Sequence, residues 1–148
     1  MDPTTRMTGD ELRQLIKLAQ FTRCVFERME ERHNRPNDLR GLCYEASLYL
    51  YNLAKAHGIT VEIGRGTCHW FVLYGDTVVD VTSTQFGHPE RVAVLPLEKA
   101  EGCGSWWHLQ GKESPLADEV YYHIASSADR EVGEMGGFEA VFSAAESI

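Results

Sequence analysis

The chain has 148 residues, of which 43% are hydrophobic, 24% are charged and 10% are aromatic, and its formal net charge is −8. This length and balance are typical of one globular domain over residues 1–148. The acidic excess argues against a nucleic-acid partner, and no apolar run approaches the ~18 residues that a bilayer span requires. Residues 1–12 also lack the apolar core of a signal peptide. We therefore expect a cytoplasmic protein without a membrane partner, of undetermined oligomeric state.

The first predicted element is a long amphipathic helix that ends near His33. Thr8 and Glu11 fit a capping box. A loop over residues 33–38 follows, and a second helix is predicted from Gly41 to the His57-Gly58 pair, because glycine commonly ends a helix. The apolar residues of the first helix recur mainly at steps of three and four: Leu12, Leu15, Ile16, Leu18, Ala19, Val25, Phe26 and Met29.

Cys43 falls in the first turn of the second predicted helix. Free backbone N–H groups and the helix dipole favour an anion at this position. We therefore expect a stabilised thiolate and a lowered thiol pKa at Cys43.

A strand and a turn are predicted over residues 60–66, and a hairpin over residues 67–82 turns at Gly75-Asp76. If this turn is a two-residue loop, Tyr74 pairs with Thr77. The same register places His69 and Asp80 on one face as diagonal neighbours, with backbones roughly 6–8 Å apart. The side chains of these two residues can close that distance.

The last third of the chain predicts a strand at 92–95, an aromatic, glycine-rich segment at 102–112 that favours a strand and a loop, and two helices. The first of these helices begins at Ser114-Pro115, with serine as its cap and proline in its first turn. The second covers residues 138–147. The predicted fold class is α+β, with N-terminal helices packed on an antiparallel sheet.

Cys43, His69 and Asp80 supply the three roles that acyl transfer needs: a nucleophile, a base and a group that orients the base. The backbone N–H of Cys43 is a natural oxyanion donor, because it lies at a helix N-terminus. Asn37, Gln20 and Gln85 are candidates for a second donor, and Gln85 can alternatively orient the site from the loop after Asp80.

Three segments carry a resemblance to a known family: GLCYEAS at 41–47, CHWFV at 68–72 and VVDVTSTQF at 78–86. They resemble the transglutaminase-like branch of the papain-like cysteine hydrolases, over about residues 38–90. The resemblance implies Cys43 as nucleophile on a helix N-terminus, with His69 as general base and acid and Asp80 as orienter on successive antiparallel strands. Two departures are Tyr44, where many members have Trp, and Trp70, which follows His69 directly and is a candidate for substrate binding.

The family includes peptidases, isopeptidases, amidases, deamidases and acyl transferases, and the small leader peptidases of lasso-peptide pathways are similar in size and layout. The resemblance therefore implies a cysteine hydrolase of an amide, peptide or isopeptide bond, with a protein or peptide substrate and no cofactor. Acyl transfer or glutamine deamidation by the same triad, and a non-catalytic inhibitor or adaptor, remain alternatives. Taken alone, Cys43 could be a buried, inert thiol and His69 an ordinary core or edge histidine. Asp80 is harder to explain in this way, because a carboxylate inside a strand is unfavourable unless it is paired or exposed.

The four cysteines are interpreted as thiols, because nothing marks the chain as secreted and none forms a CxxC pair. Cys24 is expected to be a core or part-buried residue of the first helix, and Cys68 is expected in the core. A zinc site from Cys68, His69, Cys103 and His108 matches no common spacing, so no metal is expected. Trp106 and Trp107 form part of the core or of a substrate wall, and the core is favoured.

Overall fold

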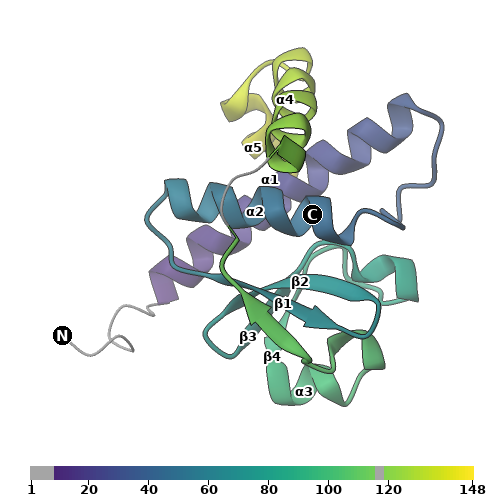
Figure 1. Ribbon diagram of the computed structural model, residues 1–148. Coiled ribbons are helices and arrows are strands. Elements are labelled where there is room, and N and C mark those ends of the chain that lie inside the picture. The colour runs from purple at the N-terminus through teal and green to yellow at the C-terminus, as the bar shows by residue number, and fades with distance from the viewer. Residues whose placement is uncertain (1–8, 116–118) are drawn as a thin grey trace.

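The computed structural model of the protein describes residues 9–115 and 119–148 (Figure 1). It combines helices with a five-stranded antiparallel sheet, which confirms the α+β class. Within the described ranges, no helix has both the length and the apolar character to cross a membrane. The elements in chain order are α1 (Gly9–Arg32), α2 (Cys43–Ala56), β1 (Glu62–Gly66), β2 (His69–Tyr74), β3 (Thr77–Asp80), η2 (Ser83–Phe86), β4 (Ala93–Pro96), α3 (Leu97–Glu101), η3 (Ser105–Trp107), β5 (Gly111–Glu113), α4 (Glu119–Glu134) and α5 (Phe138–Ala145).

The two N-terminal helices lie where the sequence predicts them. α1 begins with Asp10 and Glu11 in its first turn, where negative charge complements the helix dipole. Thr8, the other half of the predicted capping box, lies outside the described residues. α2 begins at Cys43 itself and ends at Ala56, next to Gly58, whose φ of +75° suits a residue without a side chain.

The strands are arranged in the order β4-β3-β2-β1-β5. Tyr74 pairs with Thr77 across the β2–β3 turn, which confirms the predicted register. After β4 the chain crosses the sheet and returns as β5, which pairs with the far side of β1. The aromatic segment before β5 forms the 3₁₀ turn η3 instead of the strand expected there.

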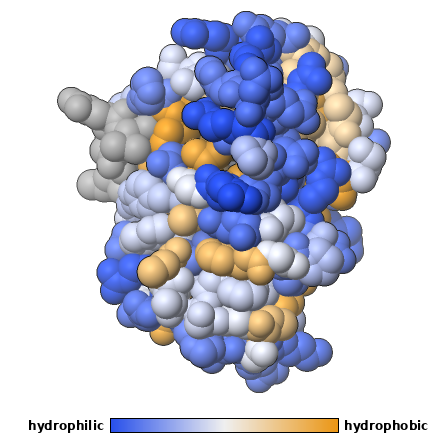
Figure 2. All heavy atoms as spheres, turned by 90° about the vertical axis from the view of Figure 1, so that its right-hand side faces the viewer, coloured by the Kyte–Doolittle hydropathy of each residue, from blue (hydrophilic) through white to orange (hydrophobic). Residues whose placement is uncertain are grey.

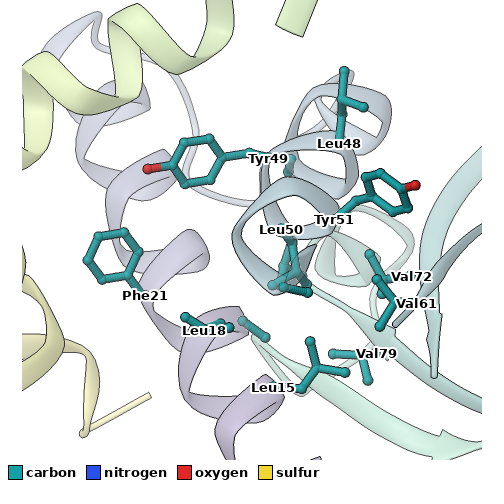
Figure 3. Close-up of a cluster of buried hydrophobic side chains, with 14 of the residues drawn as sticks. Leu15, Leu18, Phe21, Leu48, Tyr49, Leu50, Tyr51, Val61, Val72 and Val79 are labelled. Carbon is teal, nitrogen blue, oxygen red and sulfur yellow. The ribbon is translucent and has the colours of Figure 1, made fainter. Parts of the chain in front are cut away.

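Alternation of side chains divides the sheet into two faces. One face packs against α1 and α2 and forms the larger core, part of which is shown in Figure 3. α4 and α5 pack against these helices on the side away from the sheet (Figure 1). The other face is covered by α3 and η3, and its smaller core consists of Phe71, Leu73, Val78, Ala93, Ala100 and Trp107. His69 and Asp80 share the parity of Phe71 and Val78, so their side chains belong to this second face.

Candidate active site

His69 and Asp80 form a buried pair at one end of the β2–β3 hairpin. His69 is the first residue of β2 and Asp80 is the last residue of β3. The distance from His69 Nε2 to Asp80 Oδ2 is 2.6 Å, and each residue exposes only 1% of its surface. The predicted proximity of the two side chains is confirmed. The pairing explains why a carboxylate is tolerated in this strand.

Both oxygens of Asp80 accept further hydrogen bonds. The indole Nε1 of Trp107 donates to Oδ2 at 2.8 Å. The backbone N–H of Thr82 donates to Oδ1 at 2.8 Å, and the Thr82 hydroxyl lies 3.4 Å from the same oxygen. These donors fix the plane of the Asp80 carboxylate.

Trp107 thus combines two roles, of which the sequence predicted only one. It is fully buried in the smaller core, as expected, and it also orients Asp80. A buried tryptophan generally needs an acceptor for its N–H, but the sequence contains no signal that names Asp80 as that acceptor.

The environment of His69 favours its protonated form. Burial disfavours the imidazolium and lowers the pKa, but the charge of Asp80 and its hydrogen bond act in the opposite direction. Cys43 adds a smaller effect of the same sign as Asp80, and the net result raises the pKa of His69 to about 9. His69 is therefore cationic at neutral pH.

Cys43 lies close to the imidazole of His69 but belongs to a different element. It is half-buried and is the first residue of α2. Since Nε2 of His69 bonds Asp80, the ring nitrogen left for Cys43 is Nδ1, which is buried and has no hydrogen bond of normal geometry among the described residues. The thiol is nevertheless close enough to raise the pKa of His69. Long or open contacts of this kind are common in catalytic pairs without a substrate.

Gln85 and Asn37, the candidates for a second oxyanion donor, occupy different surroundings. Gln85 joins the loop before Cys43 to the loop after Asp80. Its Oε1 accepts from the backbone N–H of Gly41 at 3.4 Å, and its Nε2 donates to the carbonyl of Thr82 at 3.0 Å. Asn37 is exposed and lines a charged cavity beside α1.

The remaining candidate donor and the candidate substrate residue lie on the helix side of the sheet. Gln20 donates to the carbonyl of Ile148 at 2.9 Å, so its amide is engaged at the C-terminal end of the chain. Trp70 packs edge-on against Tyr44, with ring centroids 5.2 Å apart. Trp70 therefore contacts the residue next to Cys43, while its parity places it opposite His69.

An aromatic pair, Phe86 and Trp106, covers His69, and the sequence analysis assigned Phe86 no role. Phe86 meets the imidazole edge-on at 4.9 Å and stacks on Trp106 at 5.0 Å. Phe86 itself is 37% exposed, so it forms the surface above the buried histidine. On the side of the molecule that faces right in Figure 1, Figure 2 shows separate small apolar patches among hydrophilic residues.

The cysteines outside the site are free thiols. The prediction that Cys68 is buried is wrong. β2 begins only at His69, so Cys68 lies in the turn before it, exposed and with a φ of +52°. Cys24 is half-buried on α1. Over residues 9–115 and 119–148, no group of three or more His, Cys, Asp or Glu residues could hold a metal ion.

Comparisons with known proteins identify no relative. No protein-family model matches the chain, and neither a curated protein nor a solved structure is significantly similar to it. Any functional conclusion therefore depends on the geometry of the site and on the residues that carry it.

Proposed function

We propose that the protein is a cysteine hydrolase that cleaves an amide, peptide or isopeptide bond through an acyl-enzyme on Cys43. The observation that carries this proposal is the buried His69–Asp80 pair, whose second ring nitrogen is left for a cysteine at a helix N-terminus. A fold of the papain and transglutaminase type is part of the proposal. It is supported by the order of Cys43, His69 and Asp80 along a helix and two antiparallel strands.

The proposed reaction has two halves. In the first, the Cys43 thiolate attacks the carbonyl carbon of the scissile bond, and a C–S bond forms while the negative charge moves to the carbonyl oxygen. The imidazolium of His69 then gives its proton to the leaving nitrogen as the C–N bond breaks. In the second half, neutral His69 removes a proton from water, whose oxygen attacks the thioester carbon. The C–S bond then breaks and the acid leaves, which restores the thiolate of Cys43 and the imidazolium of His69.

Two features of the structure suit these steps. The backbone N–H of Cys43 is at the first position of α2, where a helix offers no internal acceptor, so it can donate to the developing oxyanion. The hydrogen bond to Asp80 fixes the ring of His69 and supports its positive charge. An amine in place of water would convert the same intermediate into an acyl-transfer product.

The reactivity of Cys43 towards iodoacetamide tests the pair directly. We expect Cys43 to be alkylated faster at pH 6 than the exposed Cys68 and Cys103, because ordinary thiols ionise only near pH 8.5. Mass spectrometry after timed quenching assigns the rate to each residue, so the other cysteines are internal controls. We expect His69→Ala to remove the advantage of Cys43. Equal rates for the three cysteines would favour a non-catalytic binding module.

An activated ester tests the acyl-enzyme. With p-nitrophenyl acetate we expect a burst of nitrophenolate and the mass of one acetyl group on Cys43. Cys43→Ala should abolish the burst without unfolding the protein, whereas Cys24→Ala and Cys68→Ala should retain it. Loss of the burst in Cys68→Ala but not in Cys43→Ala would overturn the assignment. Adding a primary amine separates hydrolysis from acyl transfer by the product that forms.

A further inference from the structure

A buried arginine of α1 joins the two loops that flank the candidate site. Arg23 is 2% exposed, although it carries a charge. Its Nη2 donates to the carbonyl of Asn37 at 2.7 Å. Its Nη1 donates to the carbonyl of Val81 and to the hydroxyl of Thr84, both at 2.8 Å. One guanidinium therefore holds the segment before Cys43 and the segment after Asp80 at the same time.

The carboxylate of Glu27 holds the guanidinium of Arg23 by electrostatic attraction. Arg23 Nε lies 3.4 Å from Glu27 Oε2 without making a hydrogen bond of normal geometry. Glu27 is shared with Arg91, whose guanidinium binds the carboxylate through Nε and Nη2 at 2.7–3.1 Å. Burial lowers the pKa of Arg23, and the charge of Glu27 opposes that effect. A buried cation with these partners is held in one orientation.

Two direct hydrogen bonds join the same loops. The Thr84 hydroxyl donates to the carbonyl of Asp38 at 3.0 Å, and Gln85 accepts from Gly41. We call the contacts between residues 37–41 and 81–85 the loop seam. Arg23 adds three side-chain hydrogen bonds to these two loops, one to Asn37 and two to Val81 and Thr84, and so connects both sides of the seam.

The loop seam is one of the connections that set how the nucleophile meets the base, beside the packing of α2 on β2 and the hydrogen bond from the Ser47 hydroxyl to the carbonyl of Trp70. Cys43 is carried by α2, at the end of the 37–41 segment, whereas His69 and Asp80 are carried by the sheet. No strand or helix includes both sides. A displacement of about 1 Å between reacting groups can lower a rate by about a hundredfold. The separation of Cys43 from His69 should therefore respond to any loosening of the seam.

We propose that Arg23 is a positioning residue, which acts through the loop seam to hold Cys43 against His69. This inference rests on the proposed function, since it concerns the reactivity of the same cysteine. The role is distinct from general stabilisation, because it predicts that substitutions of Arg23 and His69 have non-additive effects on the alkylation rate of Cys43. The side chains of Arg23 and His69 make no contact with each other that the structure describes. A purely structural arginine would lower stability and leave that coupling at zero.

The test is the alkylation rate of Cys43 in Arg23→Lys. Lysine keeps the charge but cannot present the planar fork that reaches both loops. In a variant that still unfolds cooperatively, we expect the rate at pH 6 to fall at least tenfold. Arg32→Lys is the matched control, because Arg32 lies on the same helix and pairs with Glu131 of α4, away from the seam. We expect the control to react like the wild type.

A double-mutant cycle separates positioning from stability. In the Arg23→Lys background, His69→Ala should reduce the Cys43 rate much less than it does in the wild type, because the pair is already apart. Equal effects of His69→Ala in the two backgrounds would overturn the inference. If Arg23→Lys does not fold, Thr84→Val decides, since it removes the hydrogen bond that crosses the seam to Asp38 and the one that Thr84 accepts from Arg23. A smaller loss of the same kind supports the inference, and unchanged reactivity refutes it. A wild-type rate that is independent of His69 would instead refute the proposed function.

Discussion

Replacing Asp80 by Asn would test the charge state of His69 with almost no change of shape. The carboxylate accepts at both oxygens: from His69 and Trp107 at Oδ2, and from Thr82 at Oδ1. The amide of Asn would present an NH₂ group to one of these two sets of donors. Whichever way the amide turns, at least one buried N–H loses its acceptor.

The size of the expected effect follows from the pKa of His69. The ordinary value is 6.5 and the environment raises it to about 9. This difference corresponds to about 3 kcal/mol in favour of the imidazolium, or a factor of about 300. Without the charge of Asp80, burial remains the main influence, so we expect the pKa of His69 to fall below 6.5. At pH 7 the protonated fraction would then fall from about 99% to less than about a quarter.

The assay is a pH titration of the imidazole ring signals by NMR, with His69→Gln used to assign the resonance. The wild type should titrate near pH 9, and Asp80→Asn should titrate below 6.5. The same variant should lose most of its Cys43 alkylation at pH 7, where little of its His69 is protonated. A wild-type His69 that titrates near 6.5, or one whose titration is the same in both proteins, would refute this account of the site.

Three further outcomes follow from the described contacts. Because the folded-state pKa of His69 is raised, its protonation should contribute about 3 kcal/mol of stability below pH 6.5. This contribution should be lost as the pH rises through about 9. Urea unfolding at pH 6 and pH 9.5 should show the loss in the wild type and not in Asp80→Asn. Trp107→Phe removes the donor to Asp80 and leaves a gap in the smaller core, so it should lower the free energy of unfolding by about 2–4 kcal/mol. A loss below 1 kcal/mol would show that the indole is dispensable. Leu48→Ala, in the larger core at 0% exposure, should cost about 2–5 kcal/mol in the same assay and leave the alkylation of Cys43 intact.

The hairpin could be predicted from the sequence because its geometry is local. Gly75 and Asp76 leave room for only a two-residue loop, and this fixes Tyr74 opposite Thr77. The alternation of side chains then places His69 and Asp80 on one face. Cys43 was placed by a different local rule, since the boundary of α2 is set by the loop and glycine that precede it.

The residues that the sequence analysis missed depend on contacts between distant segments. Trp107 meets Asp80 only because the chain returns across the sheet between β4 and β5. A signal for Arg23 was present, since it lies four residues after Ala19 and three before Phe26, on the apolar stripe of its helix. A charge at such a position implies a buried partner, but the pattern cannot identify Val81 or Asn37. Cys68 was misplaced because β2 begins two residues later than predicted, so Cys68 lies in the preceding turn, where the alternation of faces does not apply.

The crossing of residues 97–110 over the sheet also has a consequence for folding kinetics. His69 and Asp80 are separated by 11 residues and joined by a tight turn, whereas Trp107 lies 27 residues beyond Asp80. Closing a longer loop loses more chain entropy, so contacts of this kind tend to form later than a hairpin. We expect the hairpin to form early, with its charged pair still in water, and the docking of Trp107 to exclude that water near the end. Substitutions at Trp107 should then mainly accelerate unfolding. The orientation of the Asp80 carboxylate and the final step of folding would thus depend on the same indole.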